Sequence, residues 1–258
     1  MLRVSAASLT DVGGRSCNED SIAHRSYGNS LVFALADGAG GHGGGDLASS
    51  LAVRSLLDLF ERQPAGDANE LARLIKEVNR LILTAQRPGS ASQDMHSTLT
   101  ALTIDLERCV AYWAHVGDTR LYHFRNSAIA FKTSDHSLAQ ALVASGLLDP
   151  ALANDPSQRN MLTSALGSDE EDLVVSTSGT DVVLQPGDCF LLCTDGLWEH
   201  VPDLVMVNTL GQAPEPKDWL SVLRQDVLNA VQARGKHDNF SAVAIRLDPA
   251  FPLEKTIA

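Results

Sequence analysis

The chain has 258 residues, of which 44% are hydrophobic and 20% are charged, and this is enough material for one large, well-packed domain. Its formal net charge of -12 argues against a general nucleic-acid binder, which needs a positive surface to meet phosphates. The longest apolar runs are too short for a membrane span, and the four cysteines form no CxxC pair. We therefore expect a single domain over residues 1–258 in the cytoplasm, without nucleic acid or a membrane span.

Strand-like and helix-like patterns alternate along the chain. In order, we expect a strand at 31–36, helices at 46–60 and 67–86, strands at 99–106, 109–116, 120–124 and 128–132, a helix at 137–145, a strand at 189–194, helices at 203–210 and 217–233, and a strand at 240–247.

Short connections show how these strands pair. Glu107 and Arg108 alone separate the strands at 99–106 and 109–116, and three residues separate those at 120–124 and 128–132. Such short links predict antiparallel hairpins. Because the helices carry one apolar face each, we expect the α+β class, with helices covering antiparallel sheets.

Acidic residues recur where the apolar runs end. The sequence ALADGAGGHGG at 34–44 carries Asp37 from an apolar run into a glycine-rich turn; Asp195 also follows an apolar run, and Asp238 precedes one. Clustered carboxylates repel one another unless a cation neutralises them, and oxygen ligands without a Cys/His set favour Mg2+ or Mn2+. The alternative is that each aspartate caps a turn, since Asp-Gly is a common turn pair.

Two further side chains leave a functional and a structural interpretation open. Arg15 lies three residues before Asn18-Glu19-Asp20, and its guanidinium either forms an ion pair or grips a phosphate with two hydrogen bonds. His42, in the glycine-rich turn, either donates a proton near neutral pH or packs in a tight loop. That turn lacks the Gly-Lys-Ser/Thr ending of a nucleotide-binding loop.

The chain resembles the metal-dependent (type 2C) serine/threonine protein phosphatases, in their compact, stand-alone bacterial form. The resemblance rests on the order and spacing of eight short motifs: RSCNED at 15–20, ADGAGGHGGG at 36–45, STLTALTI at 97–104, HVGDTRLY at 115–122, DHS at 135–137, LTSALG at 162–167, CTDGLWE at 193–199 and HDNFSAV at 237–243. It implies a four-layer αββα sandwich, in which two antiparallel sheets pack face to face between helices.

The resemblance also implies a site for two Mg2+ or Mn2+ ions. By match, Asp37 bridges both ions, the Gly38 carbonyl binds one of them, and Asp195 and Asp238 hold the other. Asp118 matches a residue that helps to bind a third, weaker ion in bacterial members. The implied reaction is hydrolysis of phosphoserine or phosphothreonine, in which a hydroxide shared by the two ions attacks phosphorus directly.

Five more residues receive roles by the same match. Glu19 and Asp20 correspond to positions that act mainly through metal-bound water, and Asn239 to the residue paired with the last metal aspartate. Arg15 corresponds to the arginine that grips the phosphate, and His42 to the general acid that protonates the departing serine or threonine oxygen.

Two departures from the family pattern concern residues outside the implied ligand set. Ala39 stands where many members carry methionine, and Ser164 where many carry arginine, so we expect altered substrate handling. The expected partners are phosphorylated proteins, including a serine/threonine kinase or its targets, and the expected state is a monomer. The loop at 149–158 is a candidate partner surface.

Two rival functions stay open at this point. One is a phosphoprotein-binding module that keeps the fold without catalysis, and the presence of all the implied ligands argues against it. The other is a metal-dependent hydrolase of small phosphate esters.

Overall fold

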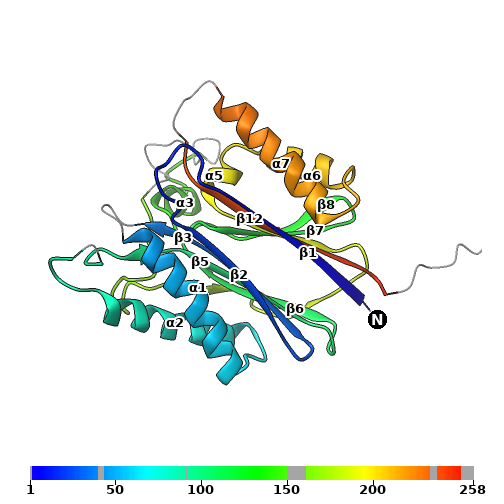
Figure 1. Ribbon diagram of the computed structural model, residues 1–258. Helices are drawn as coiled ribbons and strands as arrows, with labels where there is room; N and C mark the ends of the chain where they lie inside the picture. Colours follow the sequence, from blue (N-terminus) through cyan, green and yellow to red (C-terminus); the bar gives the residue numbers. More distant parts are fainter. Residues whose placement is uncertain (1, 40–43, 91, 150–160, 233–236, 251–258) are drawn as a thin grey trace, which may run out of the picture.

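Two antiparallel β-sheets form the centre of the protein, and helices cover their outer faces (Figure 1). The computed structural model describes residues 2–39, 44–90, 92–149, 161–232 and 237–250. Within these ranges, one sheet has the strand order β1-β12-β11-β7-β8. The other has the order β10-β6-β5-β3-β2, with β4 paired to β3 and β9 paired to β6. This arrangement confirms the expected sandwich.

Consecutive strands fall in blocks that belong first to one sheet and then to the other. The strands are β1 (Leu2–Asp11), β2 (Asp20–Tyr27), β3 (Ser30–Ala39), β4 (His96–Ser97), β5 (Leu99–Asp105), β6 (Val110–Val116), β7 (Arg120–Arg125), β8 (Ala128–Lys132), β9 (Ser176–Thr177), β10 (Val182–Val183), β11 (Cys189–Cys193) and β12 (Phe240–Pro249). The helices are α1 (Gly45–Arg62), α2 (Ala68–Ala85), α3 (Leu138–Ala144), α5 (Asp195–Trp198), α6 (Asp203–Leu210) and α7 (Pro216–Val231).

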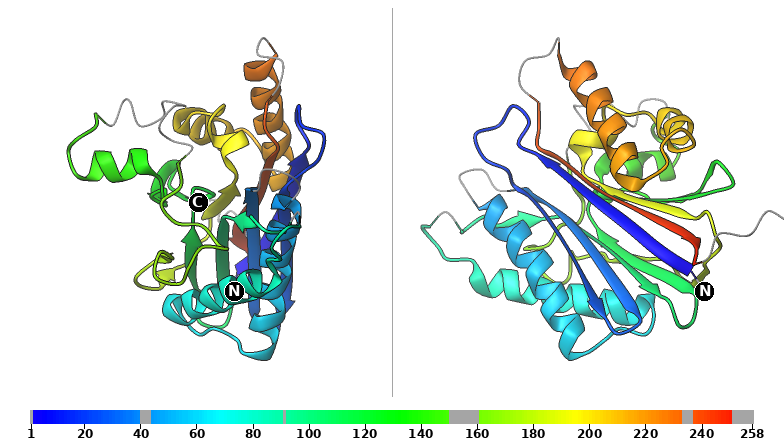
Figure 2. Two further views of the ribbon diagram at one scale, coloured as in Figure 1. Left: turned by 90° about the vertical axis from the view of Figure 1, so that its left-hand side faces the viewer. Right: turned by 45° about the vertical axis from the view of Figure 1, so that its right-hand side comes forward.

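The period-two alternation of the strands separates three layers of core. In β3, Phe33 and Leu35 point between the sheets and share an apolar cluster with Leu192 of β11. Their neighbours Val32 and Ala34 point the other way, into the cluster formed with α1 and α2. Figure 2 shows α1 and α2 on one side of the paired sheets and α7 on the other. The sheets are therefore buried on both faces at their centre.

The predicted start of the second long helix is confirmed. Asp67 is the N-cap of α2, and its side chain accepts a hydrogen bond from the Glu70 N–H at 2.8 Å. The Glu70 side chain accepts instead from the Gly66 N–H at 2.7 Å, one residue before the cap. No helix in the described ranges combines the length and apolar character that a membrane crossing requires.

Both predicted hairpins are confirmed, but the long edge strands β1 and β2 and the two-residue strands β4, β9 and β10 were not predicted. Asp105 pairs with Val110 across one hairpin, and Arg125 with Ala128 across the other. β1 and β2 lie at the edges of their sheets and are only partly buried. Their small and polar residues therefore give no apolar run of the kind seen in the central strands.

Candidate active site

Both sheets contribute to one cavity of about 320 Å³. Asp37 comes from β3, Asp118 from the turn between β6 and β7, Asp195 from the start of α5 after β11, and Asp238 from the residues before β12. The described residues that line the cavity are Arg15, Glu19, Asp37, Gly38, Ala39, Thr98, Asp118, Leu162, Asp195, Asp238 and Asn239. Side chains that are far apart in sequence, such as those of Arg15 and Asp238 at a separation of 223 residues, thus meet at one place.

Asp37 is the most constrained of the acidic residues. It lies directly opposite Asp20 in the antiparallel register of β3 and β2. Its backbone N–H donates to Thr98 Oγ1 at 2.9 Å, and its carbonyl oxygen accepts from Ser97 Oγ at 2.9 Å. Burial, and then the nearby charge of Asp195, raise the pKa of Asp37 well above its usual range.

The pKa values of the neighbouring carboxyls are raised in the same way. Burial, with a smaller contribution from the charge of Asp195, outweighs the hydrogen bonds from Ser241 and Thr194 and raises the pKa of Asp20 to about 7. Burial and Asp195 also raise the pKa of Asp118. Several buried carboxylates of one sign are stable together only if positive charge or protons offset them. The cavity is therefore suited to cations.

The donor set fits a divalent ion. Asp20 Oδ1 is buried and accepts no hydrogen bond from the described residues. The side chains around the cavity supply oxygen rather than sulfur or nitrogen ligands, which is the preference of Mg2+ and Mn2+. In the described ranges no three His, Cys, Asp or Glu side chains enclose an ion by themselves. An ion here would complete its shell with water, as Mg2+ usually does.

Asn239 fastens the loop that precedes β2. Its Nδ2 donates to the carbonyl oxygens of Val12 at 2.7 Å and Cys17 at 2.9 Å. Its Oδ1 accepts from the Glu19 N–H at 2.8 Å. One side chain thus satisfies three backbone groups and fixes the segment that carries Arg15 and Glu19 at the cavity.

Arg15 forms an ion pair with Asp238, and not with Glu19 or Asp20, the acids of its own motif. Its Nη2 lies 2.6 Å from Asp238 Oδ2, and the two side chains are 54% and 43% exposed. An exposed ion pair contributes little free energy. Arg15 can therefore leave Asp238 for an incoming anion at low cost.

Gly38 permits a close approach of three backbone segments. A Cβ atom at Gly38 would lie 2.1 Å from the Gly45 carbonyl oxygen and 2.8 Å from the Glu19 carbonyl oxygen. The Gly38 N–H donates to that Glu19 oxygen at 3.0 Å. A side chain here would push apart β3, the start of α1 and the loop before β2.

Two hydroxyl groups that support the acids were not singled out from the sequence. Thr98 accepts from the Asp37 N–H and also contacts Thr119 Oγ1 at 2.6 Å, while Thr194 Oγ1 donates to Asp20 Oδ2 at 3.0 Å. Both lie inside the motifs STLTALTI and CTDGLWE, so their positions are marked, although their partners are not. His42 and most of the 149–158 loop lie outside the described residues.

Ser164, one of the two departures, has a structural role. Its side chain is buried, and its Oγ accepts from the Val174 N–H at 2.8 Å and donates to the Val174 carbonyl oxygen at 3.1 Å. Ala39, the other departure, lines the cavity.

The fold of this chain is shared with a known class of enzymes. The sequence model of the family described as Protein phosphatase 2C matches residues 12–236. The serine/threonine protein phosphatase PstP of Mycobacterium tuberculosis is 34% identical over 204 residues, which are 78% of this chain but 37% of that protein. The chain therefore belongs to the protein phosphatase 2C family.

Two further comparisons cover more of the protein that is matched. The serine/threonine phosphatase stp of Listeria monocytogenes is 31% identical over 225 residues, which are 85% of this chain and 86% of that protein. The crystal structure of the PstP catalytic domain in complex with two manganese ions matches with a TM-score of 0.78 and 28% identity. That match covers 96% of this chain and all of that one.

Proposed function

We propose that this protein is a Mg2+- or Mn2+-dependent serine/threonine protein phosphatase, with residues 1–258 acting as one catalytic domain. The observation that carries the proposal is the convergence of four aspartates and one arginine on a single cavity. The complex of the PstP catalytic domain with two manganese ions supports the choice of metal.

The proposed ligands of the two ions are Asp37, the Gly38 carbonyl, Asp195 and Asp238, and a third ion is assigned to Asp118. Bound divalent ions would offset the charge of the phosphoryl oxygens and make nearby water more acidic. Glu19 and Asp20 would accept hydrogen bonds from the water that completes the ions' shells, and Asn239 would hold the loop that carries Glu19.

Two side chains would act on the substrate itself. Arg15 would leave Asp238 and grip two phosphoryl oxygens, which a planar guanidinium suits. His42 would protonate the serine or threonine oxygen as the phosphorus–oxygen bond breaks. Because a water molecule supplies the new oxygen on phosphorus, the products are a neutral hydroxyl side chain and inorganic phosphate.

The expected substrates are phosphorylated proteins, including a serine/threonine kinase or its targets, and the expected state is a monomer. The four cysteines are free thiols, which suits the reducing cytoplasm. We propose the cytoplasm as the place of action.

Replacement of Arg15 by alanine should raise KM for a phosphopeptide about tenfold with a smaller change in kcat. The reason is that the variant loses the charge-assisted hydrogen bond from this exposed guanidinium to the substrate phosphate. Steady-state kinetics on one phosphothreonine peptide measures this. Arg224→Ala is the matched control, since Arg224 forms a partly exposed ion pair with Asp11 and is not among the described residues that line the cavity. An unchanged KM in Arg15→Ala would show that Arg15 serves only as the ion-pair partner of Asp238.

The substrate class is tested by comparing kcat/KM for a phosphothreonine peptide with that for small phosphate esters. A protein phosphatase should prefer the peptide, because residues beside the phosphate add contacts. A preference for the small esters would favour the rival hydrolase. Tight peptide binding without phosphate release under any divalent metal would favour the binding module.

A further inference from the structure

The turn that carries Asp118 is held from outside the cavity. Trp198 Nε1 donates a hydrogen bond to the Asp118 carbonyl oxygen at 3.0 Å. One residue earlier, the His136 N–H donates to the Gly117 carbonyl oxygen at 3.0 Å, and His136 Nδ1 accepts from the Gly117 N–H at 3.2 Å. The backbone on which the Asp118 carboxyl is mounted is thus fixed on two sides.

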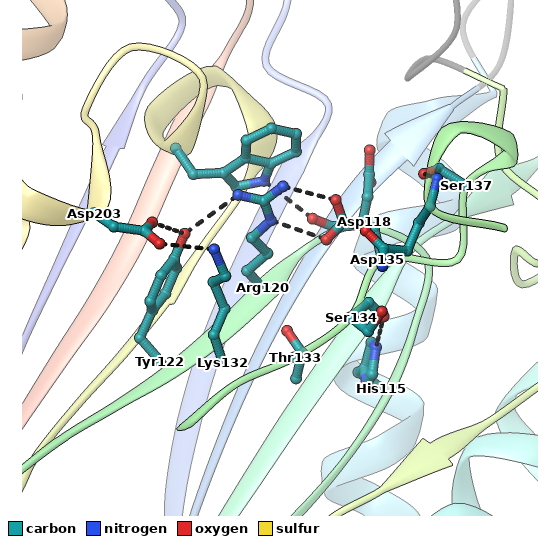
Figure 3. Close-up of polar contacts among 12 residues, drawn as sticks. His115, Asp118, Arg120, Tyr122, Lys132, Thr133, Ser134, Asp135, Ser137 and Asp203 are labelled. Atoms are coloured by element: carbon teal, nitrogen blue, oxygen red, sulfur yellow. Dashed lines mark hydrogen bonds and ion pairs between the residues drawn. The ribbon is translucent and has the colours of Figure 1, made fainter. Parts of the chain in front are cut away.

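Trp198 is in turn fixed by a charged pair. The guanidinium carbon of Arg120 lies 3.5 Å from the centre of the Trp198 ring, which is a cation–π contact. Arg120 donates to Asp135 through Nε at 2.9 Å and Nη2 at 2.7 Å. Figure 3 shows Arg120 between Asp135 and Tyr122, whose hydroxyl accepts from Arg120 Nη1 at 3.3 Å. The indole therefore has little freedom to turn away from Asp118.

Stability alone does not account for this pair. The Arg120 and Asp135 side chains are each only 12% exposed, and the cost of removing two charges from water largely offsets their attraction. Neither of them, nor Trp198, is among the described residues that line the cavity. One connection from these residues to the acidic site is the Trp198 hydrogen bond to Asp118.

We propose that Trp198, locked by the Arg120–Asp135 pair, is a positioning residue that orients Asp118 toward the most weakly bound divalent ion. The inference rests on the proposed function, which assigns Asp118 to that ion. Groups that orient a metal ligand typically change metal affinity 10- to 100-fold. Because Trp198 holds the backbone of Asp118 rather than its carboxylate, we expect an effect of about tenfold.

The test is Mn2+ binding, measured by electron paramagnetic resonance of the free ion, on the full chain. Trp198→Phe keeps an aromatic ring beneath Arg120, removes the N–H donor and makes the side chain smaller. It should weaken the last Mn2+ ion about tenfold, and adding Asp118→Asn should weaken it no further than Asp118→Asn alone. Arg120→Lys, which loses the two-point bond to Asp135, should shift the same ion in the same direction.

Trp219→Phe is the matched control. Trp219 is also buried and also donates through Nε1, to Thr209 Oγ1 at 3.1 Å, but it lies in α7 away from the acids. Its Mn2+ binding should equal that of the wild type. Thermal unfolding without metal verifies that each variant is folded.

The outcomes separate the two proposals. Wild-type protein that binds no Mn2+ would overturn the proposed function and this inference together. Wild-type binding of Mn2+ with unchanged affinity in Trp198→Phe, or an equal loss in Trp219→Phe, would overturn this inference alone.

Discussion

Replacement of Asp37 by asparagine should lower turnover of a phosphothreonine peptide by about 10³-fold or more, because a central charged ligand of the proposed ions is lost. The fold should survive. Burial and the charge of Asp195 raise the pKa of Asp37, so its ionised form is costly without a cation. A neutral amide relieves that cost, and the metal-free variant should unfold at the wild-type temperature or above it.

The measurement pairs steady-state kinetics with thermal unfolding, with and without Mn2+. Wild-type protein should gain stability from Mn2+, because a ligand that binds the folded state shifts unfolding, and the variant should gain little. Asp58→Asn is the matched control, since Asp58 is 55% exposed and pairs only loosely with Arg25. Near-normal turnover in Asp37→Asn would remove Asp37 from the site.

Replacement of Asp188 by asparagine should cost about 3 kcal/mol of unfolding free energy, the largest stability effect that we expect here. The Asp188 side chain is fully buried, and it accepts from Arg125 through Nε and Nη2, both at 2.7 Å, and from the Gln185 N–H at 2.8 Å. The variant leaves the Arg125 charge without its counter-ion. Urea unfolding at pH 7 measures the loss.

The same residue predicts a pH dependence. Burial alone would raise the pKa of Asp188, but the bonds from Arg125, the nearby His123 and the Gln185 N–H outweigh it and hold that pKa well below its usual range. An unfolded aspartate titrates near 3.9, so the unfolded state binds the proton first. The stabilisation is therefore complete above about pH 5 and is lost as the pH falls toward the folded pKa.

Between pH 5 and pH 3, the unfolding free energy of Asp188→Asn should thus fall less steeply than that of the wild type. Asp248→Asn provides the control, because Asp248 is 27% exposed and lies 3.5 Å from its arginine partners. It should cost less than about 1 kcal/mol at pH 7. Equal losses in the two variants would contradict the role given to the buried pair.

The sequence predicts the centre of this fold better than its margins. Strands such as β5, β6 and β11 are buried on both faces, and their sequences are largely apolar. The N-cap residue Asp67 marks the start of α2. β1 and β2 lie at sheet edges with partly exposed residues, so the apolar pattern that reveals a strand is weak there.

The acidic site shows a similar division. Asp37, Asp195 and Asp238 could be picked out because each adjoins an apolar strand, and the structure brings them to one cavity. The contacts that position them could not be read from spacing. The Trp198 bond to the Asp118 carbonyl and the Asn239 bonds to Val12 and Cys17 join backbone groups to side chains far away in sequence.

The role of Arg15 also depended on three-dimensional information. Its motif places it near Glu19 and Asp20 in the sequence, whereas the structure pairs it with Asp238, which lies 223 residues further along the chain. Only the folded chain shows that this arginine sits at the rim of the cavity with an exposed and easily exchanged partner.

The most direct test of the central claim is phosphate release from a phosphothreonine peptide by protein treated with EDTA, then supplied with Mg2+ or Mn2+. We expect no release after EDTA, recovery with either ion, and no recovery in Asp37→Asn under the same conditions. Release that persists in EDTA, or equal recovery by wild type and Asp37→Asn, would contradict a metal-dependent phosphatase built on this acidic cavity.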